Sequence, residues 1–79
     1  MKILYSKSAV KSIKSLNEPI KSNIRTAIEK LPQGDIKKLQ GYTSSYRLRV
    51  GNYRVIYTIK TDEIFIEDIL PRGSAYKRL

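Results

Sequence analysis

The chain has 79 residues, enough for one small domain, and we expect a single domain over residues 1–79. It contains no cysteine and no histidine, which excludes disulfides, thiolate metal sites and hydrolytic centres built on a histidine base. Sixteen basic residues against seven acidic ones give a formal net charge of +9, which predicts attraction to polyanions such as nucleic acid.

The first part of the chain predicts a short strand and two basic amphipathic helices. Residues 3–5 are apolar, as in a strand, and Ser6 can cap a helix directly after them. Asn17 can cap a second helix, which Pro32 stops. The apolar residues of both helices recur at spacings of three and four: Ala9, Val10, Ile13, Leu16, Ile20, Ile24, Ala27, Ile28 and Leu31. Neither helix carries the Trp or Phe typical of interfacial helices, so packing against a sheet is favoured over a membrane-surface role.

A connector over residues 32–44 follows the helices, with turn residues at 33–35 and at Gly41. Within it, residues 36–39 fit either one helical turn or a short strand. The type of cation also changes here, because residues 1–40 carry eight lysines and one arginine, whereas residues 41–79 carry five arginines and two lysines. Lysine suits long-range attraction and arginine suits a defined phosphate contact, so we expect a binding site in the second half.

The segment 45–60, SYRLRVGNYRVIYTIK, predicts a tight β-hairpin. Two alternating runs flank Gly51-Asn52, a dipeptide that suits a two-residue turn. In that register one face is apolar, and its pairs are Val50 with Tyr53, Leu48 with Val55, and Tyr46 with Tyr57. On the other face Arg49 lies opposite Arg54, and Arg47 lies opposite Ile56. Like charges that face each other cost roughly 0.2–1 kcal/mol, so three guanidiniums on one face indicate an anionic ligand, above all a phosphate.

A second tight turn is predicted at Thr61-Asp62, and it leads into a strand over residues 63–70. The pairs expected from this turn are Lys60 with Glu63, Ile56 with Glu67, and Arg54 with Ile69. A slip of one residue would exchange the two faces of the strand. The order β-α-α-β-β-β predicts an α+β domain, a small twisted antiparallel sheet packed by the N-terminal helical hairpin.

Several functions are excluded by what the sequence lacks. No apolar run approaches the roughly 20 residues of a membrane span, and no signal-peptide pattern follows Met1, so we expect a cytoplasmic protein with no membrane partner. There is no glycine-rich phosphate loop, and the carboxylates form local pairs that do not converge. We therefore expect no metal and no other cofactor.

The remaining candidate chemistry is cleavage of RNA, which carries its own nucleophile in the 2′-hydroxyl. That reaction needs a strand held in line and positive charge at the phosphate, and arginine supplies both. Arginine cannot accept a proton, whereas a tyrosine beside guanidiniums has its anionic form favoured. Tyr76, close behind Arg72, is the candidate for proton transfer, and it fits equally well as a C-terminal anchor on the sheet.

Three stretches of the chain resemble the RelE/ParE superfamily of toxins from type II toxin–antitoxin systems: KLQG at 38–41, YRLRVGNYRVIY at 46–57 and ILPRGSAYK at 69–77. The resemblance implies a toxin that a cognate antitoxin neutralises in a hetero-oligomer. Its RelE-like branch implies a ribosome-dependent endoribonuclease that cleaves mRNA in the 30S A site without a metal, by 2′-hydroxyl attack on the adjacent phosphate. The alternatives are a ParE-like inhibitor of DNA gyrase and a basic binding module without catalysis.

The resemblance to RelE-like nucleases also implies roles for individual residues. It assigns catalysis to Arg54, Arg72 and Tyr76, and binding of the RNA backbone to Arg47 and Arg49. We also expect Lys37 and Lys38 to bind RNA. The chain departs from some RelE-like nucleases, which have lysines at the positions of Arg47 and Arg49. A lysine can lose its proton and act as a base, and these arginines cannot.

Overall fold

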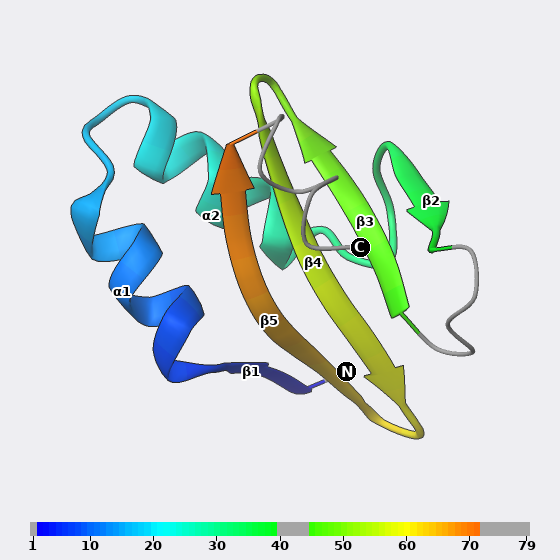
Figure 1. Cartoon of the computed structure of the whole chain (residues 1–79). Helices are drawn as coiled ribbons and strands as arrows, with labels where there is room; N and C mark the ends of the chain where they lie inside the picture. Colours follow the sequence, from blue (N-terminus) through cyan, green and yellow to red (C-terminus); the bar gives the residue numbers. More distant parts are fainter. Residues whose placement is uncertain (1, 40–44, 72–79) are drawn as a thin grey trace.

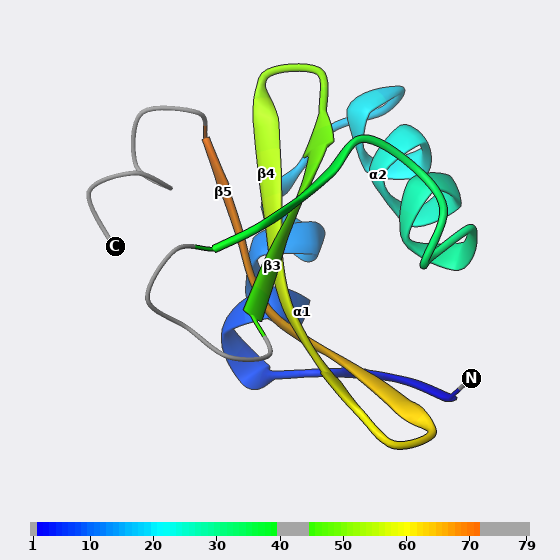
Figure 2. The same ribbon diagram turned by 90° about the vertical axis from the view of Figure 1, so that its right-hand side faces the viewer.

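In a computed structural model of the chain, residues 2–39 and 45–71 are described. The elements are β1 (Lys2–Tyr5), α1 (Lys7–Ser15), α2 (Ile20–Glu29), β2 (Ile36–Lys38), β3 (Ser45–Val50), β4 (Tyr53–Lys60) and β5 (Glu63–Pro71). The strands form one sheet in the order β1-β5-β4-β3-β2, and both helices cover the same face of it (Figures 1 and 2). The predicted α+β class is confirmed.

The sheet differs from the predicted one at its two edges. β1 pairs in parallel with β5, so the sheet is mixed and not purely antiparallel. At the other edge, β2 pairs antiparallel with β3, which answers the open question over residues 36–39 in favour of a short strand. The predicted turn residue Gly41 and the segment from Arg72 onward lie outside the described residues.

The helices begin with two different capping arrangements. Ser6 caps α1 as predicted, since its hydroxyl oxygen accepts the backbone N–H of Ala9 at 3.0 Å. The predicted Asn17 cap of α2 is wrong, because α2 begins later, at Ile20. There the longer side chain of Glu18 reaches the helix, and its carboxylate accepts the backbone N–H and the hydroxyl of Ser22 at 2.9 and 2.6 Å. These hydrogen bonds lower the pKa of Glu18.

The hydrophobic core lies between the helices and one face of the sheet. Its fully buried side chains come from α1, α2 and the three long strands: Ala9, Ile24, Ile28, Leu48, Val55, Tyr57, Ile64 and Ile66. Burying an aliphatic or aromatic side chain of this size stabilises the fold by about 1.5–3 kcal/mol. The apolar stripes of the helices are therefore used in packing, as predicted, except for Val10 and Ile20, which are 38% and 40% exposed. Within the described part of the chain, no helix has the length and apolar character that crossing a membrane requires.

The β3–β4 hairpin has the predicted register throughout. The observed pairs are Val50 with Tyr53, Arg49 with Arg54, Leu48 with Val55, Arg47 with Ile56, and Tyr46 with Tyr57. Gly51 has φ +58°, and Asn52 has no positive φ, a combination that belongs to a type II′ turn. The second predicted turn also forms, and Lys60 pairs with Glu63 across it.

A β-bulge at Glu67 overturns the predicted register of the upper half of β5. Tyr57 pairs with Ile66 but Ile56 pairs with Asp68, so Glu67 is an extra residue on β5. The predicted pairs of Ile56 with Glu67 and of Arg54 with Ile69 are therefore wrong. Their observed partners are Asp68 and Leu70, respectively.

The start of α1 fixes this bulge in place. The hydroxyl of Ser6 donates to the carbonyl oxygen of Glu67 at 2.6 Å, and its backbone N–H donates to the carbonyl oxygen of Ile66 at 2.9 Å. The hydroxyl of Ser8 donates to the carboxylate of Asp68 at 3.2 Å. The extra residue is thus held by a helix some 60 residues earlier in the chain, which no pattern local to β5 can reveal.

Candidate nucleic-acid interface

Four of the predicted site residues lie on the sheet face that the helices leave uncovered, which we call the arginine face. Lys37 of β2 pairs with Arg47 of β3, and Arg49 of β3 pairs with Arg54 of β4, so Lys37, Arg47, Arg49 and Arg54 share this face. Lys38 lies opposite Tyr46 and belongs to the helix-covered face. Arg72 and Tyr76 lie outside the described residues.

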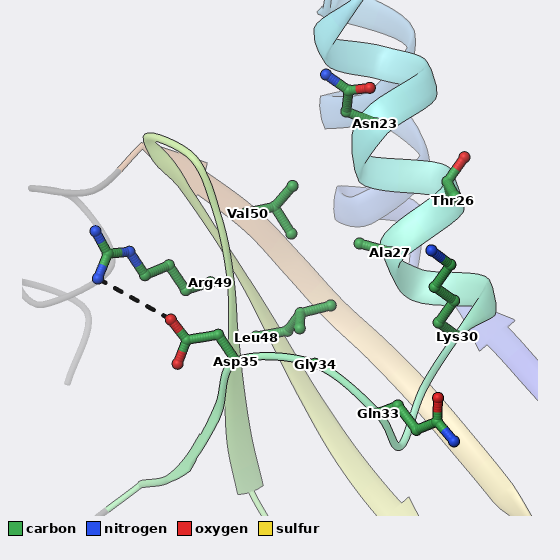
Figure 3. Close-up of a pocket in the computed structure, with 10 residues that line it drawn as sticks. All are labelled: Asn23, Thr26, Ala27, Lys30, Gln33, Gly34, Asp35, Leu48, Arg49 and Val50. Atoms are coloured by element: carbon green, nitrogen blue, oxygen red, sulfur yellow. Dashed lines mark ion pairs between the residues drawn. The ribbon is translucent and has the colours of Figure 1, made fainter.

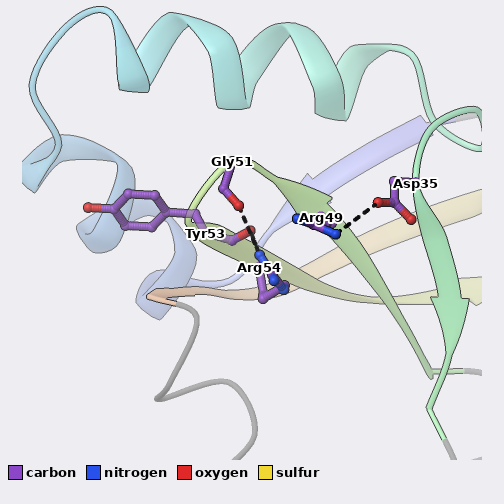
Figure 4. A network of polar contacts seen from close by, with 5 residues as sticks. All are labelled: Asp35, Arg49, Gly51, Tyr53 and Arg54. Atoms are coloured by element: carbon purple, nitrogen blue, oxygen red, sulfur yellow. Dashed lines mark hydrogen bonds and ion pairs between the residues drawn. The ribbon is translucent and has the colours of Figure 1, made fainter.

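Arg54 is buried on this face, with 3% of its surface exposed. Its Nη1 donates to the carbonyl oxygens of Gly51 and Tyr53 at 3.1 and 3.0 Å, so the guanidinium folds back onto the hairpin turn (Figure 4). Its Nε is buried without a hydrogen-bond partner among the described residues. In this conformation Arg54 braces the turn, and it needs to rotate outward to meet a ligand.

Arg49, which lies directly opposite Arg54, is exposed to solvent over more than half of its side chain. Its backbone N–H donates to the carbonyl oxygen of Asp35 at 2.9 Å, and its Nη1 lies 4.0 Å from the Asp35 carboxylate (Figures 3 and 4). An ion pair this exposed and this long contributes little. The Arg49 guanidinium is therefore free to exchange Asp35 for a phosphate.

Glu67 brings a carboxylate to the same face, and sequence reasoning gave it no role. Thr58 lies two residues beyond Ile56 on β4 and so faces the same way, and its hydroxyl donates to Glu67 Oε2 at 2.5 Å. A carboxylate accepts a proton, which guanidinium groups cannot do. The absence of histidine was the available signal, since it leaves carboxylates and phenols as the proton acceptors of this chain.

The tyrosines of the hairpin lie on the helix-covered face and take part in packing. Tyr46 and Tyr57 stack with ring centroids 5.5 Å apart and an interplanar angle of 21°. Burial, and secondly the neighbouring Tyr46, raises the pKa of Tyr57 to about 12. The Tyr57 hydroxyl has no hydrogen-bond partner within the described residues. These phenols are core groups, remote from the arginine face.

A hollow of about 430 Å³ separates α2 from β3 on the helix side of the sheet (Figure 3). The residues that line it are Asn23, Thr26, Ala27, Lys30, Gln33, Gly34, Asp35, Leu48, Arg49 and Val50. Gly34 is required here, because its φ is +133° and an added Cβ would lie 2.8 Å from Leu48 Cδ1. The hollow meets the arginine face only at Arg49 and Asp35.

Comparisons with known proteins agree with this fold. Residues 3–76 match the family model of the ParE toxin of the type II toxin–antitoxin system parDE. The chain is 37% identical to Toxin RelE3 of Methanocaldococcus jannaschii over 84 aligned positions, which cover 96% of each protein. It is 40% identical over 72 positions to the putative toxin RelE1 of the same organism, covering 89% of this chain and 76% of that one.

Two solved toxin–antitoxin complexes have a closely similar toxin fold. The RelB-RelE complex from Methanococcus jannaschii superposes with a TM-score of 0.81 at 34% identity, covering 96% of this chain and 98% of that one. The RelE-RelB complex from Pyrococcus horikoshii OT3 gives a TM-score of 0.73 at 31% identity, covering 91% and 94%. On the strength of the family model and these identities, the chain belongs to the RelE/ParE family of toxins of type II toxin–antitoxin systems.

Proposed function

We propose that this toxin is a RelE-like endoribonuclease that cleaves mRNA in the ribosomal A site, without a metal, and that a cognate antitoxin neutralises it. The observation that carries the proposal is the arginine face, where Lys37, Arg47, Arg49 and Arg54 gather on adjacent strands. The antitoxin partner is supported by the archaeal relatives, whose structures are complexes of RelE with RelB.

In this mechanism the arginines bind and neutralise, and RNA supplies the nucleophile. Arg47 and Arg49 hold the phosphate backbone, and Arg54 and Arg72 neutralise the charge that builds up on the scissile phosphate. The 2′-oxygen loses its proton and forms a bond to phosphorus, while the bond from phosphorus to the 5′-oxygen breaks. The leaving 5′-oxygen takes up a proton from water, which gives a 2′,3′-cyclic phosphate and a 5′-hydroxyl.

Two groups are candidates to accept the proton of the 2′-hydroxyl. Tyr76 is the residue that the family resemblance assigns to proton transfer or base stacking. Glu67 is the second, because its carboxylate reaches the arginine face through the hydrogen bond from Thr58. Replacing either by its neutral isostere (Tyr76→Phe or Glu67→Gln) separates the two, and general base catalysis contributes about 10²- to 10⁴-fold.

Inhibition of DNA gyrase is the second candidate function, and it is favoured by the match to the ParE toxin model over residues 3–76. A gyrase inhibitor blocks supercoiling in a purified assay and leaves translated mRNA intact. A basic binding module without catalysis does neither, and its expression without an antitoxin leaves growth unaffected.

The test is primer extension on a message translated in the presence of purified toxin. We expect wild type to cut, and Arg54→Lys and Arg72→Ala to cut at least about 100-fold more slowly, because each loses a fixed donor to the phosphate. Lys60→Ala is the matched control, since Lys60 is an exposed cation at the far end of β4. Uncut message with wild type would contradict the nuclease assignment, and blocked supercoiling in the parallel gyrase assay would replace it.

A further inference from the structure

A second cationic surface lies on the outer side of α1, away from the arginine face. Lys7, Lys11 and Lys14 are exposed and follow one another at spacings of four and three residues, so they lie along one side of the helix. With Tyr5 and Val10 they line a hollow of about 420 Å³, which we call the lysine hollow. Tyr5 and Val10 are 36% and 38% exposed, so they add apolar surface beside the three ammonium groups.

The needs of the fold do not explain this arrangement. Lysines four residues apart destabilise a helix by about 0.2–0.5 kcal/mol, and a lysine in the first turn opposes the helix dipole. No acidic residue occurs in α1 to offset them, since its sequence is KSAVKSIKS. The ion pair between Arg49 and Asp35 is the one found among residues 2–39 and 45–71, so the three lysines are unpaired there. Packing of α1 on the sheet uses its other side, centred on Ala9.

Tyr5 supplies a neutral aromatic surface beside these lysines. Burial raises the pKa of Tyr5, while Arg25 lowers it and Glu29 raises it to a lesser extent, so the phenol stays protonated at neutral pH. Aromatic side chains beside cationic ones are the usual means of binding single-stranded nucleic acid, with bases stacked on the rings and phosphates on the cations. Lysine suits such a surface, because its mobile ammonium accepts many phosphate geometries.

We propose that the lysine hollow is a second RNA site, in which a single-stranded segment places a base on Tyr5 and its phosphates on Lys7, Lys11 and Lys14. This site would bind RNA without taking part in catalysis, and its binding does not depend on cleavage at the arginine face. An anionic membrane fits less well, because α1 has only nine residues and Val10 is its one large apolar side chain that is exposed. Since the two cationic surfaces face different directions, they would hold different segments of RNA.

The test measures binding of a fluorescein-labelled 2′-O-methyl oligouridine, which lacks the 2′-hydroxyl and cannot be cleaved. Full-length protein carrying Arg47→Ala and Arg49→Ala serves as background, so that the arginine face contributes little. In it, Lys7, Lys11 and Lys14 are changed together to Ala, and a matched control changes Lys21, Lys30 and Lys60 to Ala. Both triple variants lose the same charge, so only the position of the lysines differs.

We expect the first triple variant to reduce the steepness of the fall of log K (the association constant) with log salt concentration by about 2, as three lost phosphate contacts on a single strand should. The control should keep the slope. An equal change of the salt dependence in both variants would overturn the proposal, since it would mean that RNA binding depends on the net charge and not on the position of the lysines. Binding of phosphatidylserine vesicles that needs the three lysines, with oligouridine binding unchanged, would overturn it in favour of a membrane surface.

Tyr5 is tested separately, by Tyr5→Phe and Tyr5→Ser. We expect Phe to keep the affinity and Ser to lose about tenfold, because only the ring stacks on a base. A crosslink from a 4-thiouridine oligonucleotide to wild-type protein, mapped by mass spectrometry, gives the same information without a variant. We expect it at Tyr5, and a crosslink confined to the arginine face would overturn the site. If RNA does not bind at the lysine hollow, the proposal of mRNA cleavage still stands. If the protein does not cleave mRNA, the binding assay still tests the lysine hollow.

Discussion

The two faces of β4 each bury one polar side chain, and the two are three residues apart. Arg54 lies on the arginine face with 3% of its surface exposed, and Tyr57 lies on the helix-covered face with none exposed. Each buries an atom without a hydrogen-bond partner among the described residues, Nε of Arg54 and the hydroxyl of Tyr57. One of these groups carries a full charge and the other is neutral.

That difference gives the two side chains different consequences for the stability of the fold. Tyr57 loses a hydroxyl hydrogen bond, a cost of about 1–3 kcal/mol, but its ring fills the core and stacks on Tyr46. Arg54 brings a charge whose desolvation costs several kcal/mol, and among residues 2–39 and 45–71 it receives two backbone carbonyls in return. The fold benefits from burying Tyr57, whereas the buried charge of Arg54 is consistent with the phosphate contact that we propose for it.

The largest effect is expected from removing the packing residue. Tyr57→Ala should lower the free energy of unfolding by about 3–5 kcal/mol, because it leaves a cavity at the centre of the core. Urea denaturation followed by circular dichroism measures this. Tyr53→Ala, at a half-exposed position of the same strand, should cost clearly less. Equal losses would show that Tyr57 is not the centre of the core.

The second effect is a loss of stability at alkaline pH that depends on the Tyr57 hydroxyl. Its pKa is about 12 in the folded protein and about 10 in an unfolded chain, so the unfolded state releases the proton first. The stabilisation is complete below pH 10 and is lost as the pH rises through 12, amounting to about 3 kcal/mol. Tyr57→Phe lacks this titration and retains the stacked ring. We therefore expect its stability to equal or exceed that of wild type at pH 7, and the gap to widen between pH 10 and 12.

Urea denaturation of both proteins across this pH range provides the comparison. Because lysines and other tyrosines titrate in the same range in both proteins, only the difference between the two curves is interpreted. A constant difference would mean that the Tyr57 hydroxyl is not buried as described.

The same strand shows which features the sequence predicts and which it does not. The pairing of β3 with β4, and with it the shared face of Arg47, Arg49 and Arg54, was predictable because a two-residue turn and strict alternation are local signals. The burial of Arg54 was not predictable, since alternation assigns a side chain to one face of the sheet but does not say how deeply that side chain is buried there.

Wrong predictions arose both from distant contacts and from local details of side-chain reach and register. The bulge at Glu67 is held by Ser6, so the register of β5 beyond Ile66 could not be read from β5 itself. The start of α2 was predicted wrongly for a local reason, because the longer side chain of Glu18, and not Asn17, reaches the backbone N–H of Ser22. Of the predicted site, Lys38 lies on the other face, since its place depends on the register of β2.

The smallest change in stability is expected from Arg54→Met, and it tests the comparison most sharply. Methionine has a similar length and no charge, so the variant gives up two charge-assisted hydrogen bonds, each worth about 1.5–3 kcal/mol, and is relieved of a desolvation penalty of several kcal/mol. These terms nearly cancel, and we expect the free energy of unfolding to stay within about 1 kcal/mol of wild type while mRNA cleavage falls at least about 100-fold. Arg54→Ala is the control that adds a cavity and should be less stable than Arg54→Met. If methionine instead cost more than about 3 kcal/mol, Arg54 would be a structural brace of the Gly51 turn, and its proposed contact with the phosphate would lose its physical basis.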